Sequence, residues 1–410
     1  MSVRKRTWAD ARGAEKSAWV VDYVDAKGTR RLKTFKLKKL ADAFAATASV
    51  EVREGTHVAD SVSATVKQAA VFWLASAAAL GLERTTIDSY RSHVDLHIVP
   101  FIGAAKISAL NIPAVRAFED ELRQAGRSPV MIRKILVSLG TLLADAQERG
   151  LAARNVVREM RGRRKGEKRQ ERRQKGRLKV GLDIPTRGEI KALVAALSGR
   201  WRPLLLTAIF TGLRASELRG LRWSDVDLDG RSVRVHQRAD RFNIIGRPKS
   251  ESGERTVPAP PIVVNALREW KLVCPKRDSG KVDGDGNPIM VLDLVFPNGQ
   301  GKVEQLNNIV RRGLQPAQVA AGVAIDSGQV DEKGNAILVA RYKGLHALRH
   351  FYASWCINRT ADGGLGLPLK VVQERMGHSS VTLTADVYGH LFPRGDDAEE
   401  LAAAERSLLG

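Results

Sequence analysis

Apolar residues recur at helical spacing in several segments of the first half of the chain, and glycine or proline corners separate these segments. The segments are residues 69–81, 85–99, 112–125 and 129–149. A helical region of this size can enclose a single hydrophobic core. We therefore predict a compact helical domain over residues 61–157.

The N-terminal residues show the alternation of apolar and polar positions that is typical of strands. Residues 19–24 alternate weakly, residues 25–28 form a hairpin-turn signal, and residues 30–37 form a partner strand with a basic face. An amphipathic helix is expected over residues 40–52. The pattern predicts a small sheet-and-helix domain over residues 1–60.

Helix and short-strand signals alternate in the largest region, residues 180–395. Thr186 and Glu189 form a capping box that opens a helix extending to Leu197, and an apolar helix is expected over residues 203–211. The predicted fold class is mostly α with small β-sheets (α+β). Short strands at 231–239 and 255–258 flank a turn at 246–253, and surface hairpins are expected at 282–289 and 330–337.

Two predicted helices near the end of this region carry titratable side chains. If residues 345–355 are helical, His346 and Arg349 share a face, because positions three apart lie on one side of a helix. A second helix is predicted over residues 381–388, after a pair of serines that can cap it. These helices would bring side chains from both segments into one short region.

The side chains gathered there are those needed to attack a phosphodiester. They comprise a cation at Arg349, imidazoles at His346 and His378, and a phenol at Tyr388. Such a set offers a nucleophile, stabilising charge and proton donors. Neither a glycine-rich phosphate loop nor a carboxylate-rich metal cluster accompanies it, so metal-free chemistry is expected.

A calcium site at the turn with Asp283 and Asp285 would lack the remaining loop ligands. We therefore expect no metal and no cofactor.

The charge of the chain indicates a polyanionic partner. Its 410 residues carry a formal net charge of +22, and a charge of this size favours nucleic acid. Residues 1–40 hold 12 Lys or Arg against 4 Asp or Glu, and residues 158–179 hold 12 against 3. A basic protein without an acidic partner is the alternative, but it does not account for this clustering.

The block at residues 158–179 has almost no large apolar residue, so we predict an extended or loosely helical linker. A nuclear-import signal or a solvated spacer is one interpretation, and a segment that tracks DNA phosphates is the one we favour. Residues 1–60 are either a sheet that enters a DNA groove or a solubilising accessory domain. The candidate DNA-contacting residues are Arg4, Lys5, Arg6, Arg30, Arg31, Lys33, Arg163, Arg164, Lys165, Arg172 and Arg173.

Cysteine and hydropathy patterns predict a soluble intracellular protein. Cys274 and Cys356 have neither metal-binding nor disulfide spacing, which suits a reducing compartment. The N-terminus lacks the apolar core of a secretory signal. The longest apolar run, residues 69–80, is too short to span a bilayer and is predicted to be a buried helix.

A further motif lies at residues 211–225, which contain Thr-Gly-Leu-Arg-x-x-Glu-Leu with Arg214 and Glu217. The combined motif, in chain order, is Arg214, His346-x-x-Arg349, Gly377-His378 and Tyr388. With this set the chain resembles the tyrosine recombinase family, the phage integrases in particular. The resemblance is strong over residues 180–395, moderate over the helical domain and weaker over residues 1–60.

The resemblance implies a role for each residue of the motif. Tyr388 would be the nucleophile that forms a 3′-phosphotyrosine, with His346 as its acid or base. Arg214 and Arg349 would hold the non-bridging phosphate oxygens, for which planar guanidinium groups are suited.

Three more residues complete the implied site. His378 would hydrogen-bond a phosphoryl oxygen, Lys249 would protonate the leaving 5′-oxygen, and Glu217 would hold part of the site in place. Because a covalent intermediate conserves the bond energy, no ATP is expected.

Four neighbouring residues receive no role in the chemistry. Tyr342 and Tyr352 are competing phenols that we expect to pack in the core. His350 is interpreted as a helix neighbour, and His390 lies beyond the tyrosine.

The resemblance also implies a domain organisation and partners. The expected parts are an arm-type DNA-binding domain (1–60), a core-binding domain (61–157), a linker (158–179), a catalytic domain (180–395) and a tail helix that docks on a neighbouring protomer (396–410). The expected partners are double-stranded DNA at core and arm attachment sites, a homotetramer on DNA, a host DNA-bending protein and a directionality factor. The expected location is the nucleoid of a bacterial cytoplasm, without a membrane.

The function implied is integration and excision of a phage or other mobile element through a Holliday junction. A resolvase of chromosome dimers or plasmids shares this chemistry, but it would not usually need residues 1–60. A type IB topoisomerase shares the phosphotyrosine chemistry as well, and an inactive DNA-binding protein would keep only the binding. Against an inactive protein, no expected catalytic position is substituted.

Overall fold

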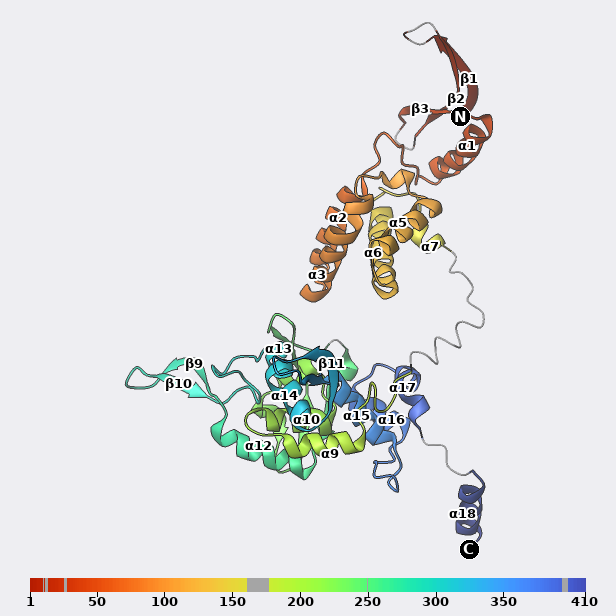
Figure 1. Ribbon diagram of the computed structural model, residues 1–410. Coiled ribbons are helices and arrows are strands. Elements are labelled where there is room, and N and C mark those ends of the chain that lie inside the picture. Colours follow the sequence, from red (N-terminus) through yellow and green to blue (C-terminus); the bar gives the residue numbers. More distant parts are fainter. Residues whose placement is uncertain (10, 12–13, 26–27, 161–176, 249, 393–396) are drawn as a thin grey trace. The chain divides into compact units, whose positions relative to one another are not determined.

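The computed structural model describes residues 1–410 except 10, 12–13, 26–27, 161–176, 249 and 393–396. The described chain forms two compact units, residues 1–164 and 165–410 (Figure 1). The predicted linker contacts Arg163, Arg164, Lys165, Arg172 and Arg173, and the predicted acid Lys249, lie outside the described residues.

A three-stranded antiparallel sheet begins the first unit, in the order β1 (Ser2–Ala9), β2 (Glu15–Val24) and β3 (Arg30–Phe35). Helix α1 (Lys38–Arg53) packs against one face, where Val21, Tyr23 and Ala41 are buried together. The sequence pattern predicts β2, β3 and α1 but gives no strand over residues 4–6. Residues 4–6 lie in β1. In this strand Val3 is half-buried and the other residues are exposed, so no alternation of apolar and polar positions marks it.

The predicted helices of the helical region are confirmed. They are α2 (Val66–Ala79), α3 (Arg84–His93) with the π-helical turn η1 (Val94–Ile98), α5 (Ile112–Gln124) and α6 (Pro129–Glu148). Two short helices that the pattern does not predict, α4 (Val99–Ile102) and α7 (Val156–Glu159), complete the region. Thr65, Asn111 and Ser128 cap α2, α5 and α6 with their side chains. Residues of α6 such as Ile135 and Leu139 are fully buried in the core of this region.

Residues 69–79 are helical as predicted, but the prediction that this helix is buried holds for one of its faces only. One face of α2, including Ala70 and Trp73, is buried, but the side chains of Val71 and Phe72 are 63% and 44% exposed. Helix α2 lies at the edge of its core, so its apolar composition does not imply burial on all sides.

The core of the second unit is built around helix α10 (Trp201–Thr211), which is buried on nearly all sides. Elements of the first part of this unit are α9 (Arg187–Ala196), α11 (Ala215–Gly220), η3 (Trp223–Asp225), β4 (Val226–Asp227), β5 (Ser232–Val235), β6 (Arg238–Ala239), β7 (Ile245–Gly246), η4 (Glu251–Gly253), β8 (Arg255–Pro258) and α12 (Pro261–Val273). Strands β4, β5 and β8 form one small sheet, and β6 pairs with β7. The capping box of Thr186 and Glu189 is present as predicted.

The C-terminal part of this unit supplies the helices that carry the histidines and the tyrosine. Its elements are α13 (Leu306–Asn308), η5 (Ile309–Leu314), α14 (Gln315–Ala320), α15 (His346–Ile357), α16 (Leu369–Met376), α17 (Val381–Tyr388), η6 (Gly389–Leu391) and α18 (Asp397–Leu409). Helix α15 packs on α10, and the side chain of Ser380 caps α17.

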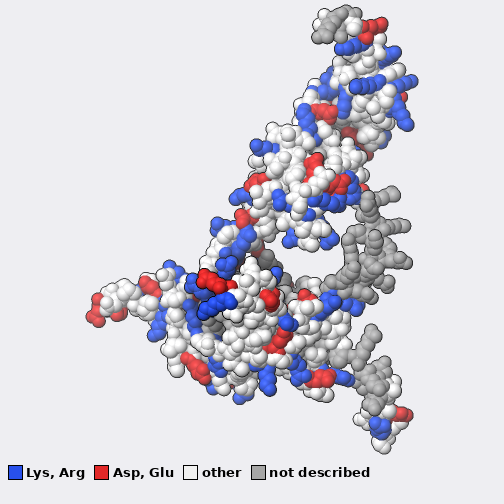
Figure 2. All heavy atoms as spheres, in the orientation of Figure 1, with Lys and Arg blue, Asp and Glu red and all other residues white. Residues whose placement is uncertain are grey.

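Two hairpins are inserted in this unit, as the sequence predicted: β9 (Arg277–Val282) with β10 (Pro288–Val291), and β11 (Ala324–Val330) with β12 (Ala336–Ala340). Their turns are alike, because Asp283 and Asp331 each accept backbone hydrogen bonds from residues two and four positions later. Acidic side chains colour the tip of the first hairpin red in Figure 2.

Candidate active site

The loop between α10 and α11 places the first arginine of the motif. Gly212 ends α10 in the left-handed region, with φ of 62°, and a Cβ there would collide with the ring of Tyr352. Arg214 is the N-cap residue of α11. The backbone N–H of Arg214 donates a hydrogen bond to the Glu217 carboxylate at 2.8 Å. The Thr-Gly-Leu-Arg-x-x-Glu pattern is therefore a glycine turn followed by a helix cap.

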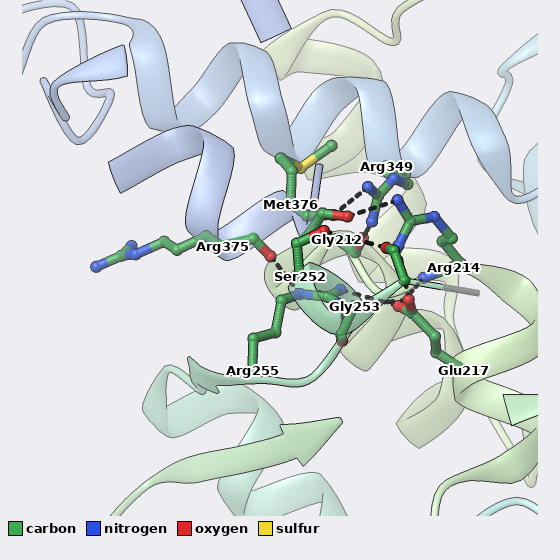
Figure 3. Close-up of polar contacts among 11 residues, drawn as sticks. Gly212, Arg214, Glu217, Ser252, Gly253, Arg255, Arg349, Arg375 and Met376 are labelled. Carbon is green, nitrogen blue, oxygen red and sulfur yellow. Dashed lines mark hydrogen bonds and ion pairs between the residues drawn. The ribbon is translucent and has the colours of Figure 1, made fainter. Parts of the chain in front are cut away.

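The Glu217 carboxylate joins two guanidinium groups (Figure 3). Nη1 of Arg214 donates to Oε1 at 2.8 Å, while Arg255 donates to Oε1 at 3.1 Å and to Oε2 at 2.9 Å. Burial alone would raise the pKa of Glu217, but the hydrogen bonds and charge of Arg255, with the charges of Arg214 and Arg349, lower it to about 2. Glu217 is therefore ionised in this site.

Three arginines hold the last carbonyls of α16. Arg255 donates through Nε to the carbonyl of Arg375 at 2.7 Å, Arg349 donates to that of Met376, and Arg214 donates to that of Gly377 at 2.9 Å. Carbonyls at a helix C-terminus lack helical partners and carry partial negative charge, which cations satisfy. The end of α16 thereby fixes the relative positions of guanidiniums from three separate segments.

Position 377 requires glycine because the backbone there is left-handed and Arg255 lies close to it. It ends α16 with φ of 60°, and a Cβ would lie 2.7 Å from Nη1 of Arg255. His378 follows, with Nδ1 2.9 Å from the hydroxyl of Thr384. Burial and the charges of Arg349 and Arg214 lower the pKa of His378 to about 4.

The arginines differ in their access to a substrate. Arg349 is buried at 2% exposure and also donates to the carbonyl of Gly212 at 2.6 Å. Burial and the charge of Arg214 lower the pKa of Arg349. The side chain of Arg255 is 6% exposed, whereas that of Arg214 is 37% exposed. Arg214 is thus the most open cation of the three.

Tyr388 lies at the end of α17 beside two histidines. Its ring stacks on that of His378, with 6.2 Å between centroids and an angle of 4°. Its hydroxyl is 2.8 Å from Nδ1 of His350. Burial raises the pKa of Tyr388 to about 12, against the charges of Arg349 and Arg214.

The other histidine of α15 is at the surface. His346 is exposed, and its ring lies 4.4 Å from that of His350 between centroids. Burial and the charges of Arg349 and Arg214 lower the pKa of His346.

The structure brings together all of the described residues that the sequence analysis assigned to the site: Arg214, Glu217, His346, Arg349, His378 and Tyr388. It also corrects one interpretation, because His350 is not merely a helix neighbour but the hydrogen-bond partner of Tyr388. The available signal was its position four residues after His346. The sequence places Arg255 only in a strand, and no spacing connects it with Glu217.

The competing phenols pack as predicted. Tyr342 is 5% exposed, and its hydroxyl donates to Glu189 at 2.8 Å. Tyr352 is 1% exposed, and burial raises its pKa. His390 contacts the carbonyl of Leu178 through Nε2 at 2.7 Å.

The predicted DNA-contacting residues of the sheet fall on both of its faces. Lys5, Arg31 and Lys33 pair in register with Trp19, Tyr23 and Val21, so they lie on the side of α1. Arg31 and Lys33 form ion pairs there, with Asp25 at 2.8 Å and Asp60 at 2.5 Å.

Arg4, Arg6 and Arg30 alternate with these residues and point to the opposite face, where all three are exposed. Arg4 and Arg30 both pair with Asp22. Figure 2 shows lysine and arginine side chains in blue over this sheet.

Neither a metal site nor a membrane span is found among the described residues. No group of three or more His, Cys, Asp or Glu side chains among them could hold a metal ion. In the same part of the chain, every helix is too short or too polar to cross a membrane.

Comparison with known proteins decides the family. The model of the phage integrase family matches residues 186–394, just over half of the chain. The chain belongs to the phage integrase family. It is a tyrosine-type site-specific recombinase.

The similarity to known proteins extends beyond residues 186–394. The tyrosine recombinase XerC-like protein of Caldanaerobacter subterraneus subsp. tengcongensis is 25% identical over 359 residues, which cover 84% of this chain and 83% of the relative. The Tn1549 transposon integrase in complex with transposon right end DNA is 18% identical, with a TM-score of 0.56 over 84% of this chain and 99% of that one. A lambda integrase tetramer bound to a Holliday junction is 16% identical, with a TM-score of 0.52 over 92% and 96%. The two structural similarities establish the fold.

Proposed function

We propose that this recombinase integrates and excises a phage or other mobile element, through a 3′-phosphotyrosine intermediate and a Holliday junction. The observation that carries the chemistry is the joining of Arg214, Arg349, His378 and Tyr388 within one domain. The structurally similar integrases support the DNA substrate, since one is bound to transposon right end DNA and another to a Holliday junction.

Each site residue receives a role from its chemistry. Tyr388 attacks the scissile phosphate, while Arg214 and Arg349 stabilise charge on the non-bridging oxygens. His378 donates a hydrogen bond to a phosphoryl oxygen, and His346 takes part in proton transfer at the tyrosine.

Two further residues support the reaction. Glu217 holds Arg214 in place through the contacts described above. Lys249, which lies outside the described residues, protonates the leaving 5′-oxygen. The phosphotyrosine conserves the energy of the phosphodiester, so strands rejoin without ATP.

The remaining parts of the chain are assigned to DNA binding and assembly. The N-terminal sheet binds arm sites through Arg4, Arg6 and Arg30, and the helical region binds core sites. The basic segment at residues 158–179 tracks phosphates. The tail helix α18 docks on a neighbouring protomer in a tetramer, with a host bending protein and a directionality factor as accessories.

A resolvase of chromosome dimers is the second candidate, because the curated relatives include XerC proteins. The N-terminal sheet favours an integrase, since a resolvase would not usually need it. We therefore place the integrase first.

A nicked suicide substrate tests the chemistry. Sites taken from DNA that flanks the gene are offered to the wild type and to Tyr388→Phe, and a covalent protein–DNA adduct is expected only with the wild type. An adduct that persists in Tyr388→Phe would move the nucleophile to another residue. Recombination assays then separate the two functions: joining of two different attachment sites is expected, and resolution of repeated identical sites alone would favour the resolvase.

A further inference from the structure

Among the described residues, the Tyr388 hydroxyl has one hydrogen-bond partner, and it is His350. The two side chains come from α17 and α15, with 2.8 Å between Nδ1 and the hydroxyl oxygen. His346, to which proton transfer at the tyrosine was assigned, contacts the ring of His350 instead. The residue in direct contact with the nucleophile is therefore His350.

The protonation states favour transfer from the phenol to this imidazole. Burial lowers the pKa of His350 to about 4, reinforced by the neighbouring His346 and Arg349 and opposed by Asp183. His350 is thus neutral at physiological pH, and its Nδ1 can accept the hydrogen bond in the tautomer that carries the proton on Nε2. Because burial raises the pKa of Tyr388 to about 12, the phenol does not ionise by itself.

We propose that His350 is a catalytic residue that accepts the proton of Tyr388 during strand cleavage. The inference rests on the phosphotyrosine chemistry proposed above. In this step the hydroxyl proton passes to Nδ1 of His350 and the Tyr388 oxygen forms a bond to phosphorus. The bond from phosphorus to the 5′-oxygen breaks, and that oxygen takes its proton from a separate acid. Rejoining reverses each transfer.

The experiment compares single-turnover cleavage of the suicide substrate by full-length variants. His350→Asn places an amide where Nδ1 lies, so the hydrogen bond to Tyr388 is kept while proton acceptance is lost. General base catalysis contributes about 100-fold or more, so the cleavage rate should fall by about that factor. His390→Gln is the matched control, because it retains a donor to the Leu178 carbonyl beside the site and should cleave at nearly the wild-type rate.

Two modified reactants distinguish a base from other roles. A substrate with sulfur in place of the bridging 5′-oxygen needs no proton on its leaving group, so the His350→Asn defect should persist with it. A fluorinated tyrosine at position 388 has a more acidic phenol and should reduce the defect. A structural role for His350 would leave the defect unchanged by phenol acidity.

Several results would overturn the proposal. Full recovery with the sulfur substrate would assign His350 to the leaving group. Cleavage by His350→Asn at or above the wild-type rate would show that the contact is dispensable or restrains Tyr388. Thermal unfolding and duplex binding confirm that each variant is folded, and His350→Ala replaces His350→Asn if the latter is not. If the wild type itself forms no adduct, the proposed function fails first and this inference fails with it.

Discussion

Replacement of Arg255 by glutamine should disturb the whole arginine cluster, because this residue joins three parts of the site. It contacts both oxygens of Glu217, the carbonyl of Arg375 at the end of α16, and the carbonyl of Gly253 in the turn before β8. The side chains of Arg255 and Glu217 are only 6% and 2% exposed, so solvent screens their interaction little. Glutamine is neutral and cannot restore the paired contact.

The magnitude follows from the state of Glu217. The cluster lowers its pKa from 4.5 to about 2, and each tenfold change in ionisation is worth about 1.4 kcal/mol, so the ionised carboxylate is favoured by about 3 kcal/mol. Because the folded pKa is the lower one, this stability is fully present above pH 4.5 and is lost as the pH falls toward 2. Arg255 is the largest of the causes that lower this pKa, so Arg255→Gln should remove most of this stability, up to about 3 kcal/mol at pH 7 and only about 1 kcal/mol near pH 2.5.

Urea unfolding of the full chain, followed by a short protease pulse, measures this loss for the second unit by itself. Glu217→Gln and the double variant complete a cycle in which Arg255 and Glu217 should couple by about 2–3 kcal/mol. Arg200→Gln is the matched control, because Arg200 pairs with a different buried glutamate, Glu304, at 2.8 Å. It should be additive with Glu217→Gln. Additivity of Arg255→Gln and Glu217→Gln, or a loss that does not shrink in acid, would refute the electrostatic explanation.

Three further outcomes are expected. Replacement of Arg4, Arg6 and Arg30 by alanine should reduce the steepness of the plot of log affinity for the arm site against log salt concentration by about 2–3, because each phosphate contact contributes about 0.9. An unchanged slope in filter-binding assays, or an equal loss of affinity at core sites, would speak against arm contacts. Deletion of residues 396–410 should impair synapsis more than binding to a single site, and gel-shift assays showing normal synapsis would exclude protomer docking by the tail. Gly212→Ala should destabilise the second unit by about 3 kcal/mol, because position 212 has a positive φ and the added Cβ would collide with the ring of Tyr352. A loss under about 1 kcal/mol in urea unfolding would show that the turn can relax.

Much of the local structure was predictable because its causes lie within a few residues of one another. Thr186 and Ser380 cap helices that their neighbours specify. The structure adds two such signals that the sequence analysis used only as motifs: Gly377 is a left-handed helix end, and the motif around Arg214 is a glycine turn before a helix cap. Such signals depend on backbone geometry over one or two turns, so a single sequence carries them.

The missed features depend on tertiary contacts. Arg255 and Glu217 are 38 residues apart, and nothing in the spacing shows that β8 brings one to the other. His350 follows His346 by one helical turn, but the sequence does not say which side of α15 faces Tyr388. Strand β1 lacks apolar alternation, so the pattern does not reveal it. Helix α2 is apolar yet exposed on one face, because tertiary packing places this helix at the edge of the core.

The arrangement of charge also bears on how the site would work. Arg214, Arg255 and Arg349 supply three positive charges, and Glu217 supplies one negative charge among them. The depressed pKa of Arg349 shows that this excess is costly before substrate binds, since burial and a like charge both oppose its ionisation. On the proposed chemistry, a phosphodiester brings one negative charge, and the five-coordinate transition state brings a second. The cluster is therefore neutralised most completely in the transition state. Because the carbonyls of α16 already fix the guanidiniums, little reorganisation is needed at that moment, which is the condition under which electrostatic stabilisation accelerates a reaction.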